Sequence, residues 1–338
     1  MPTFTPRPVP AWRICLALAL VAVAGRAAAE TVYATSFGTG ELIRFESSDP
    51  AGTRTVVSGS GTLVKPSALA FGPDGNLYIG EDGDGATYAP RITRFTVATG
   101  TLSPVLAFNA FDVFPGSLVF KGTDLLVGRN PFYANTGPIV RVAGATGGAP
   151  TASDYTTGGG LASSPGLALA ADGTLYVSDQ TYTFGTGVAS GPVKRFDAAG
   201  AYVGEVIAGG SGGLAGPTGL VVAGSTLYTA SLMNGTILQT NLATDVTQPF
   251  AAAGAPFETG VLARLAAGDL LAGSPSGSGA IYRFATDGTL VSTFASGLGQ
   301  VGGIAVAPVP EPSGAALVAM GAACLAGGLV RRRSSCRR

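Results

Sequence analysis

The densest group of acidic side chains in this sequence is the segment Glu81-Asp82-Gly83-Asp84-Gly85. Carboxylate oxygens on a glycine-rich turn are the ligands that Ca²⁺ prefers, although the closing Glu of an EF-hand loop is absent. A solvated acidic turn explains the same pattern, so both interpretations stay open. The chain contains no histidine. Ser-His-Asp and Cys-His catalysis are therefore excluded.

Aromatic residues form a second candidate site, on three glycine-rich segments that we expect to be loops: 82–91, 130–138 and 180–192. Rings on exposed loops can bind a sugar or a peptide, and they can equally pack over the ends of neighbouring strands. The candidate residues of this binding face are Tyr88, Phe132, Tyr133, Tyr182 and Phe184.

A repeated apolar segment indicates the elements that would position these residues. Its six copies begin at residues 32, 77, 125, 175, 227 and 270. A second apolar segment follows each copy and a third precedes it. In two repeats an Asp-Gly pair joins the preceding segment to the copy, which is a strong hairpin signal. A variable fourth segment, such as 102–108, completes four strands per repeat. This is the pattern of a β-propeller.

The two ends of the repeat array predict a closed ring. The first copy starts at Val32 without a preceding inner strand, and the missing strand occurs at the far end as 303–307. Counting inner strands near residues 66, 116, 165, 217, 260 and 302 gives six blades. We therefore predict an all-β, six-bladed propeller of four-stranded blades over residues 30–308, in which the last strand completes the first blade and removes the open edges.

Two copies of the repeat carry a family resemblance. Pro-Asp-Gly-Asn-Leu-Tyr-Ile at 73–79 and Ala-Asp-Gly-Thr-Leu-Tyr-Val at 171–177 resemble NHL-repeat propellers and the related gluconolactonase (SMP-30) propellers. The resemblance covers about residues 31–307 and is informative for the fold rather than for the activity.

The gluconolactonase resemblance implies a divalent ion, such as Ca²⁺, in the central channel, held by Glu, Asn and Asp side chains. The matching candidates are Glu81, Asn130 and Asp179, and Asn109 and Asp112 could add ligands. Such an ion would activate a water for attack on a lactone. The corresponding positions of the other blades are Ser36, Ser231 and Ser274, which leaves this ligand set incomplete.

The N-terminal end reads as an export signal over residues 1–29. Arg7 and Arg13 supply its positive region, 14–25 its short apolar region, and Ala27-Ala28-Ala29 a small-residue cleavage site before Glu30.

The C-terminal end, residues 309–338, has three parts. Val309-Pro310-Glu311-Pro312 precedes the apolar run 313–330, which is long enough for a single membrane helix, and the basic tail 331–338 begins with Arg331, Arg332 and Arg333. This order resembles the PEP-CTERM sorting signal of Gram-negative bacteria. The resemblance implies an exosortase-type membrane protease as partner, anchorage in the inner membrane before sorting, and then a place at the cell surface or outside the cell. A plain stop-transfer anchor is the alternative.

The charge of the chain argues against one class of partner. Between residues 30 and 330 there are 12 basic and 20 acidic residues, a difference of −8, which disfavours nucleic acid as a partner. We expect a ligand-binding or scaffolding module that meets extracellular polysaccharide or another surface protein, more readily than an enzyme. The alternative is a metal-dependent, gluconolactonase-like hydrolase.

Overall fold

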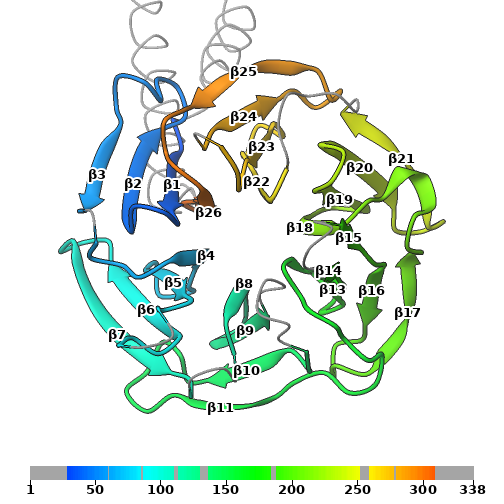
Figure 1. Ribbon diagram of the computed structural model, residues 1–338, viewed down its shortest axis with the longest axis horizontal. Coiled ribbons are helices and arrows are strands. Elements are labelled where there is room, and N and C mark those ends of the chain that lie inside the picture. The colour runs from blue at the N-terminus through cyan, green and yellow to red at the C-terminus, as the bar shows by residue number, and fades with distance from the viewer. Residues whose placement is uncertain are drawn as a thin grey trace, which may run out of the picture. The chain divides into compact units, whose positions relative to one another are not determined.

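The computed structural model describes residues 29–59, 61–84, 87–109, 113–129, 136–183, 188–251, 259–277 and 279–308. Within them, six four-stranded antiparallel sheets stand around a common centre, as Figure 1 shows. Each sheet is one blade, and its strands run in order from the centre to the rim. The six-bladed, four-stranded prediction is therefore confirmed.

The first three blades have the following strands. Blade 1 contains β26 (Val301–Val306), β1 (Thr31–Ser36), β2 (Glu41–Glu46) and β3 (Thr55–Ser58); blade 2 contains β4 (Pro66–Phe71), β5 (Leu77–Glu81), β6 (Arg91–Thr96) and β7 (Thr101–Ala107); blade 3 contains β8 (Pro115–Lys121), β9 (Asp124–Arg129), β10 (Val140–Ala143) and β11 (Thr151–Asp154).

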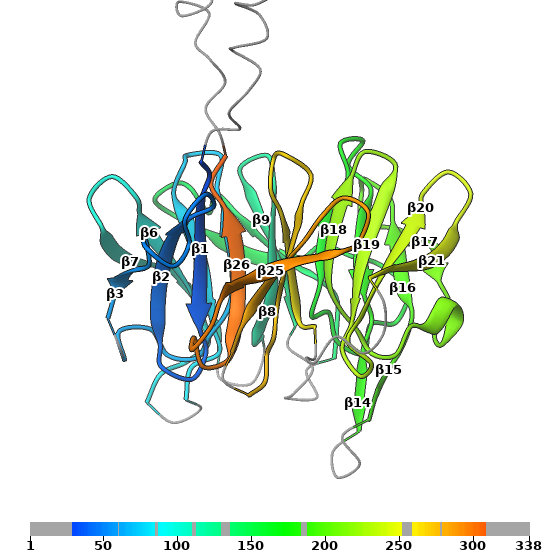
Figure 2. The same ribbon diagram turned by 90° about the horizontal axis from the view of Figure 1, so that it is seen from above.

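The other three blades follow the same order. Blade 4 contains β12 (Leu167–Leu169), β13 (Leu175–Ser178), β16 (Val193–Phe196) and β17 (Tyr202–Ile207); blade 5 contains β18 (Pro217–Ala223), β19 (Thr226–Ser231), β20 (Thr236–Asn241) and β21 (Val246–Ala251); blade 6 contains β22 (Val261–Arg264), β23 (Leu270–Gly273), β24 (Ile281–Phe284) and β25 (Leu290–Ala295). Blade 4 also carries a small hairpin that its sequence pattern does not predict, β14 (Thr181–Thr183) with β15 (Val188–Ser190), which projects from one face of the ring (Figure 2).

The hydrophobic core lies between the blades. Each of the six clusters of buried apolar side chains combines residues of two adjacent blades. Tyr33 and Leu42 of blade 1, for example, pack with Ile79 and Phe95 of blade 2. Because every sheet buries both faces in this way, the second strand of a blade is buried along most of its length, as in β5 and β13.

The ring is closed by pairing of the first and last strands of the propeller. β1 pairs with β26 in antiparallel register, with Ala34 opposite Ile304, and the Ala307 N–H donates to the Thr31 carbonyl at 2.8 Å. Ile304 packs into the cluster between blades 6 and 1. The closing strand predicted at 303–307 is therefore present, two residues longer at its start.

Adjacent inner strands approach so closely that glycine is required at the hub. A Cβ atom added at Gly166 would lie 1.9 Å from the Thr218 carbonyl oxygen, and one added at Gly302 would lie 1.9 Å from that of Pro66. Hydrogen bonds join each blade to the next at this level: Thr35 Oγ1 to Pro66 O, Ser67 Oγ to Pro115 O, Ser117 Oγ to Ser164 O, Ser178 Oγ to Thr218 O, Thr218 Oγ1 to Thr259 O, and Val301 N to Ser274 O.

The two predicted terminal segments, 1–29 and 309–338, fall almost wholly outside the described residues. Among the residues that are described, no helix is both long and apolar enough to cross a membrane. The export signal and the anchor stay predictions.

Candidate functional site

A cavity of about 340 Å³ lies at one end of the central channel, and we call it the mouth cavity. All six blades contribute to its wall, because every inner strand begins at this end of the ring. The residues from these strand starts are Gly302, Ser67, Gly116, Pro165, Thr218 and Val261. Below it the channel narrows to a second space of about 70 Å³ between the same strands.

In four of the blades, residues just beyond the second strand form the described rim of the mouth cavity. Phe37 follows β1, Leu232 follows β19, and Pro275 lies just beyond β23. In blade 4 the rim residue is Gln180, at the start of the connection that carries the β14–β15 hairpin. The described starts of these connections between second and third strands thus lie at this face.

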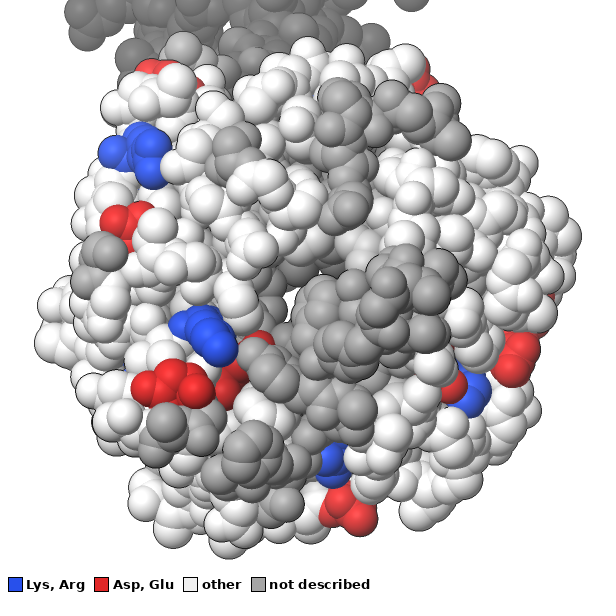
Figure 3. All heavy atoms as spheres, viewed as in Figure 1, with Lys and Arg blue, Asp and Glu red and all other residues white. Residues whose placement is uncertain are grey.

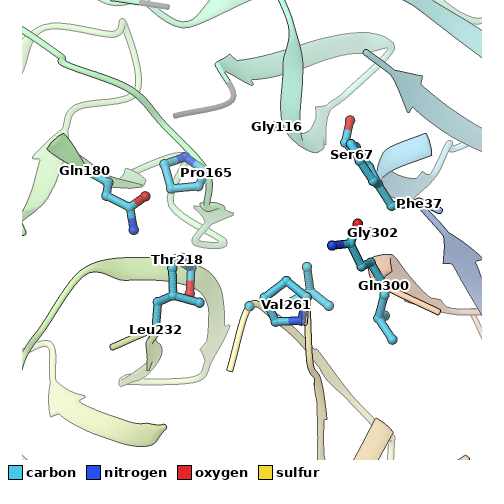
Figure 4. A pocket seen from close by; sticks show the side chains of 13 residues that line it. Phe37, Ser67, Gly116, Pro165, Gln180, Thr218, Leu232, Val261, Gln300 and Gly302 are labelled. Carbon is cyan, nitrogen blue, oxygen red and sulfur yellow. The ribbon is translucent and has the colours of Figure 1, made fainter. Parts of the chain in front are cut away.

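Gln180 is the polar side chain that the wall leaves incompletely bonded. It is 1% exposed, and its Nε2 donates to the Pro217 carbonyl at 3.1 Å. Its Oε1 is buried and accepts no hydrogen bond. Figure 4 shows the amide directed toward the cavity, with Pro165 and Thr218 beside it. A buried acceptor without a donor costs about 1–3 kcal/mol, which a ligand donor can recover.

The hydroxyl groups of the wall are already used by the protein. Ser67 Oγ bonds Pro115 O and Asp82 Oδ1, and Thr218 Oγ1 donates to Thr259 O at 3.0 Å. These bonds hold neighbouring blades together and leave the wall less polar than its residue types suggest.

The structure places Glu81, one of the proposed metal ligands, inside blade 2 rather than on the wall of the mouth cavity. Its fully buried carboxylate accepts from Arg91 Nε and Nη2, both at 2.9 Å, from Thr93 Oγ1, and from the Val64 N–H at 2.7 Å. The hydrogen bond with Glu81 raises the pKa of Arg91. Both carboxylate oxygens are therefore engaged within the protein.

Asp179 has the equivalent position in blade 4 and the equivalent bonds. Its Oδ1 accepts from the Ala162 N–H at 2.7 Å, and its Oδ2 lies 2.5 Å from Lys194 Nζ. Lys194 also donates to the carbonyls of Gly159 and Gly160. Neither Glu81 nor Asp179 is among the described residues that line the mouth cavity, and their geometry does not fit them to hold a channel ion.

The acidic segment at 81–85 is bonded to itself and to its blade. Asp82 is fully buried, with Ser67 Oγ donating to its Oδ1 at 2.9 Å. Asp84 Oδ1 accepts the N–H groups of Thr87 and Tyr88, at 2.7 and 2.8 Å, and so closes the loop on itself. No group of three or more Asp, Glu, Cys or His side chains suited to a metal occurs among the described residues.

Three further metal-ligand candidates are Asn109, Asp112 and Asn130. Asn109 is described and exposed, whereas Asn130 and Asp112 fall outside the described residues. Asn130 follows β9 as Gln180 follows the second strand of blade 4.

Of the five candidate aromatics, Tyr88 is the one whose side chain the structure describes. It is 46% exposed at the mouth face, and the guanidinium of Arg91 lies 5.4 Å from its ring centroid. Tyr182 belongs to β14, but its side chain is outside the described part. Phe132, Tyr133 and Phe184 are likewise outside the described residues. The aromatic face stays a prediction.

Charge is sparse on the face that carries the mouth cavity. Figure 3 shows a few acidic and basic side chains scattered around the ring, while most of the described surface there is neither. None of the described residues lining the cavity is acidic or basic. The site is therefore suited to a neutral ligand.

Comparisons with known proteins show the fold and no more. No family model matches the sequence, and no curated protein matches it. Among solved structures, a chain of the crystal structure of a nidogen/laminin complex is similar to this one. The TM-score is 0.65 at 14% sequence identity, over 82% of this chain and 98% of that chain. The two are alike in fold. At this identity the likeness extends to the propeller and not to a ligand.

Proposed function

We propose that this protein is an exported binding and scaffolding module that receives its ligand at the mouth cavity. The observation that carries the proposal is the cavity itself, which has a neutral wall built by all six blades and a buried acceptor without a donor. The similarity in fold to a chain of a nidogen/laminin complex supports a binding role without naming a partner.

The position of the chain ends supports a role in display. β1 runs toward the mouth, since Phe37 just after it lines the cavity, and Thr31 at its start is bonded to Ala307. A strand of six residues spans about 20 Å. The propeller is therefore entered and left on the face opposite the mouth cavity.

The proposal also gives the two terminal segments a role. Export by the signal at 1–29, followed by sorting of the 309–338 segment by an exosortase-type protease, would place the propeller at the cell surface or in the extracellular matrix. Matrix polysaccharide and surface proteins are then the partners within reach.

The test is retention of the exported protein by producing cells and their matrix, measured as the bound fraction after washing. Gln300 is exposed and lines the cavity, so Gln300→Arg brings a charge to the mouth without disturbing the core. We expect retention to fall about fivefold or more, because bound ligand would desolvate an unpaired charge.

Val291→Arg is the matched control, because Val291 is 54% exposed on the outer strand β25. It should leave retention unchanged. Equal retention of both variants and the wild type would overturn the proposal that the mouth cavity binds the partner.

A further inference from the structure

The wall of the mouth cavity combines apolar side chains with one buried hydrogen-bond acceptor. Phe37, Leu232, Val261, Pro275 and Val301 supply the apolar surface, and the described lining contains no charged group. Among the described polar residues of the wall, Gln180 is the one with a buried atom that lacks a partner. Pockets of this composition bind through apolar contact and are made selective by the few polar groups present.

The orientation of the Gln180 amide is fixed by its bond to the backbone. An amide nitrogen donates and cannot accept, so the atom facing the Pro217 carbonyl at 3.1 Å is the nitrogen. The other terminal atom is therefore the carbonyl oxygen, which requires a donor. A ligand that only accepts hydrogen bonds cannot satisfy it.

From this geometry we propose that the mouth cavity binds a neutral, largely apolar ring group that donates one N–H or O–H to Gln180 Oε1. The inference rests on the proposed function and specifies the chemistry of the group that enters the cavity. In a partner or a free small molecule, that group is of the indole or phenol type.

Sugars and ions fit this wall poorly. A sugar ring carries hydroxyl groups around its circumference, and those of Ser67 and Thr218 that could pair with them are committed to neighbouring blades. Each unpaired hydroxyl would be desolvated at a cost. A cation would meet no free carboxylate among the described lining residues, and an anion no basic side chain. A matrix sugar would instead have to bind outside the mouth cavity.

The experiment compares two probes of nearly equal shape, indole and benzofuran, of which only indole has an N–H. Each is titrated by calorimetry into the exported protein purified from cells that produce the full chain, and into its Gln180→Met variant. Methionine keeps the length of the side chain and removes the acceptor. Equal thermal unfolding midpoints of the two proteins show that the variant is folded.

The wild type should bind indole about fivefold or more tightly than benzofuran, because only indole satisfies the buried oxygen. Gln180→Met should abolish that preference while it still binds benzofuran, and D-glucose should not compete with indole. Equal binding of the two probes by the wild type, or no binding of either, would overturn the inference, and neither result depends on how the variant folds. A preference that survives in folded Gln180→Met would do the same.

The two proposals fail in distinguishable ways. Loss of retention in Gln300→Arg without any indole preference would keep the binding role and refute the ligand chemistry. An indole preference with unchanged retention would keep the cavity's chemistry and refute its part in retention.

Discussion

At the residue scale, a backbone N–H needs an acceptor at the same place in three blades, and a different side chain accepts it in each. The connection that enters a blade brings a backbone N–H against the end of the second strand. Val64 donates to Glu81, Ala162 to Asp179, and Ala215 to Ser231 Oγ at 2.8 Å. A buried N–H needs an acceptor, and any of these oxygens serves. The two carboxylates then need a cation, which the third strand supplies.

The buried carboxylate of Glu81 predicts that removing its partner Arg91 destabilises the fold. Arg91→Met leaves a fully buried carboxylate without its ion partner, and we expect the free energy of unfolding to fall by about 2–3 kcal/mol. This is less than for a fully buried pair, since the Arg91 side chain is 27% exposed. Urea denaturation of the variant and the wild type measures the difference.

The double variant Glu81→Gln with Arg91→Met is the control, because a neutral amide needs no cation. It should recover much of the loss. A double variant as unstable as Arg91→Met alone would show that the charge of Glu81 is not what Arg91 compensates.

At the element scale, the inner strands set the geometry of the hub. At this level hydrogen bonds join each blade to the next, and glycine occurs where backbones of neighbouring blades come closest, as at Gly166 and Gly302. The first strand of blade 4 is also the shortest of the inner strands, with three residues, and Gly166 immediately precedes it. Close approach of the backbones is therefore part of what holds six blades, rather than a looser ring, around the channel.

Close packing of the hub predicts that Gly166→Ala destabilises the propeller. The new methyl group would overlap the Thr218 carbonyl of the next blade, so one of the strands has to move. Such overpacking costs about 1–3 kcal/mol. Thermal unfolding of the exported protein measures it.

Gly38→Ala is the matched control, because an added Cβ there meets nothing within 4 Å. Its unfolding midpoint should equal that of the wild type. Equal midpoints for both alanine variants would mean that the inner strands have room to separate.

At the scale of the whole molecule, the described lining of the mouth cavity carries no charge, and the first and last strands of the propeller begin and end on the opposite face. Residues 30–330 carry an excess of eight acidic groups (20 against 12), but none of the described residues that line the mouth cavity is acidic. Long-range electrostatic attraction therefore contributes little at this face.

Binding at the mouth should accordingly be insensitive to salt. Between 50 and 500 mM NaCl we expect the affinity for indole, and the retention of the exported protein, to change by less than about twofold. Each ion pair made with a polyanion would instead lower the affinity steeply over this range. A steep decline with salt would point to a charged partner bound elsewhere on the ring.

The strands, their grouping into six blades and the closing strand could be predicted from the sequence, because alternation and turn residues act locally and repeat along the chain. The Asp74-Gly75 turn illustrates this, since Gly75 has the positive φ of 74° that such a turn needs. The β14–β15 hairpin was missed because its short strands, with Thr181 and Ser190 paired, lack an apolar repeat.

Two of the candidate residues predicted for the channel, Glu81 and Asp179, are bonded inside their own blades in the structure. Side chains alternate along a strand, so in blade 4 moving one place on from Asp179 exchanges the interior of the blade for the channel. Glu81 and Asp179 are on the interior side of that boundary, and Gln180 is on the channel side. Gln180 occupies the repeat position one place beyond Asp179, and an alignment of the repeats brings it level with Phe37, Leu232 and Pro275 of the rim.

The sequence by itself determined the ring, because the hydrophobic pattern and the turns of each blade are written in consecutive residues. Tertiary structure alone decided which polar groups have hydrogen-bond or ion-pair partners within the protein and which have none. The carboxylates of Glu81 and Asp179 meet cations and backbone donors, while Gln180 Oε1 meets none among the described residues. Hydrogen-bond partners come from other strands and other blades, and their positions are fixed only when the ring closes.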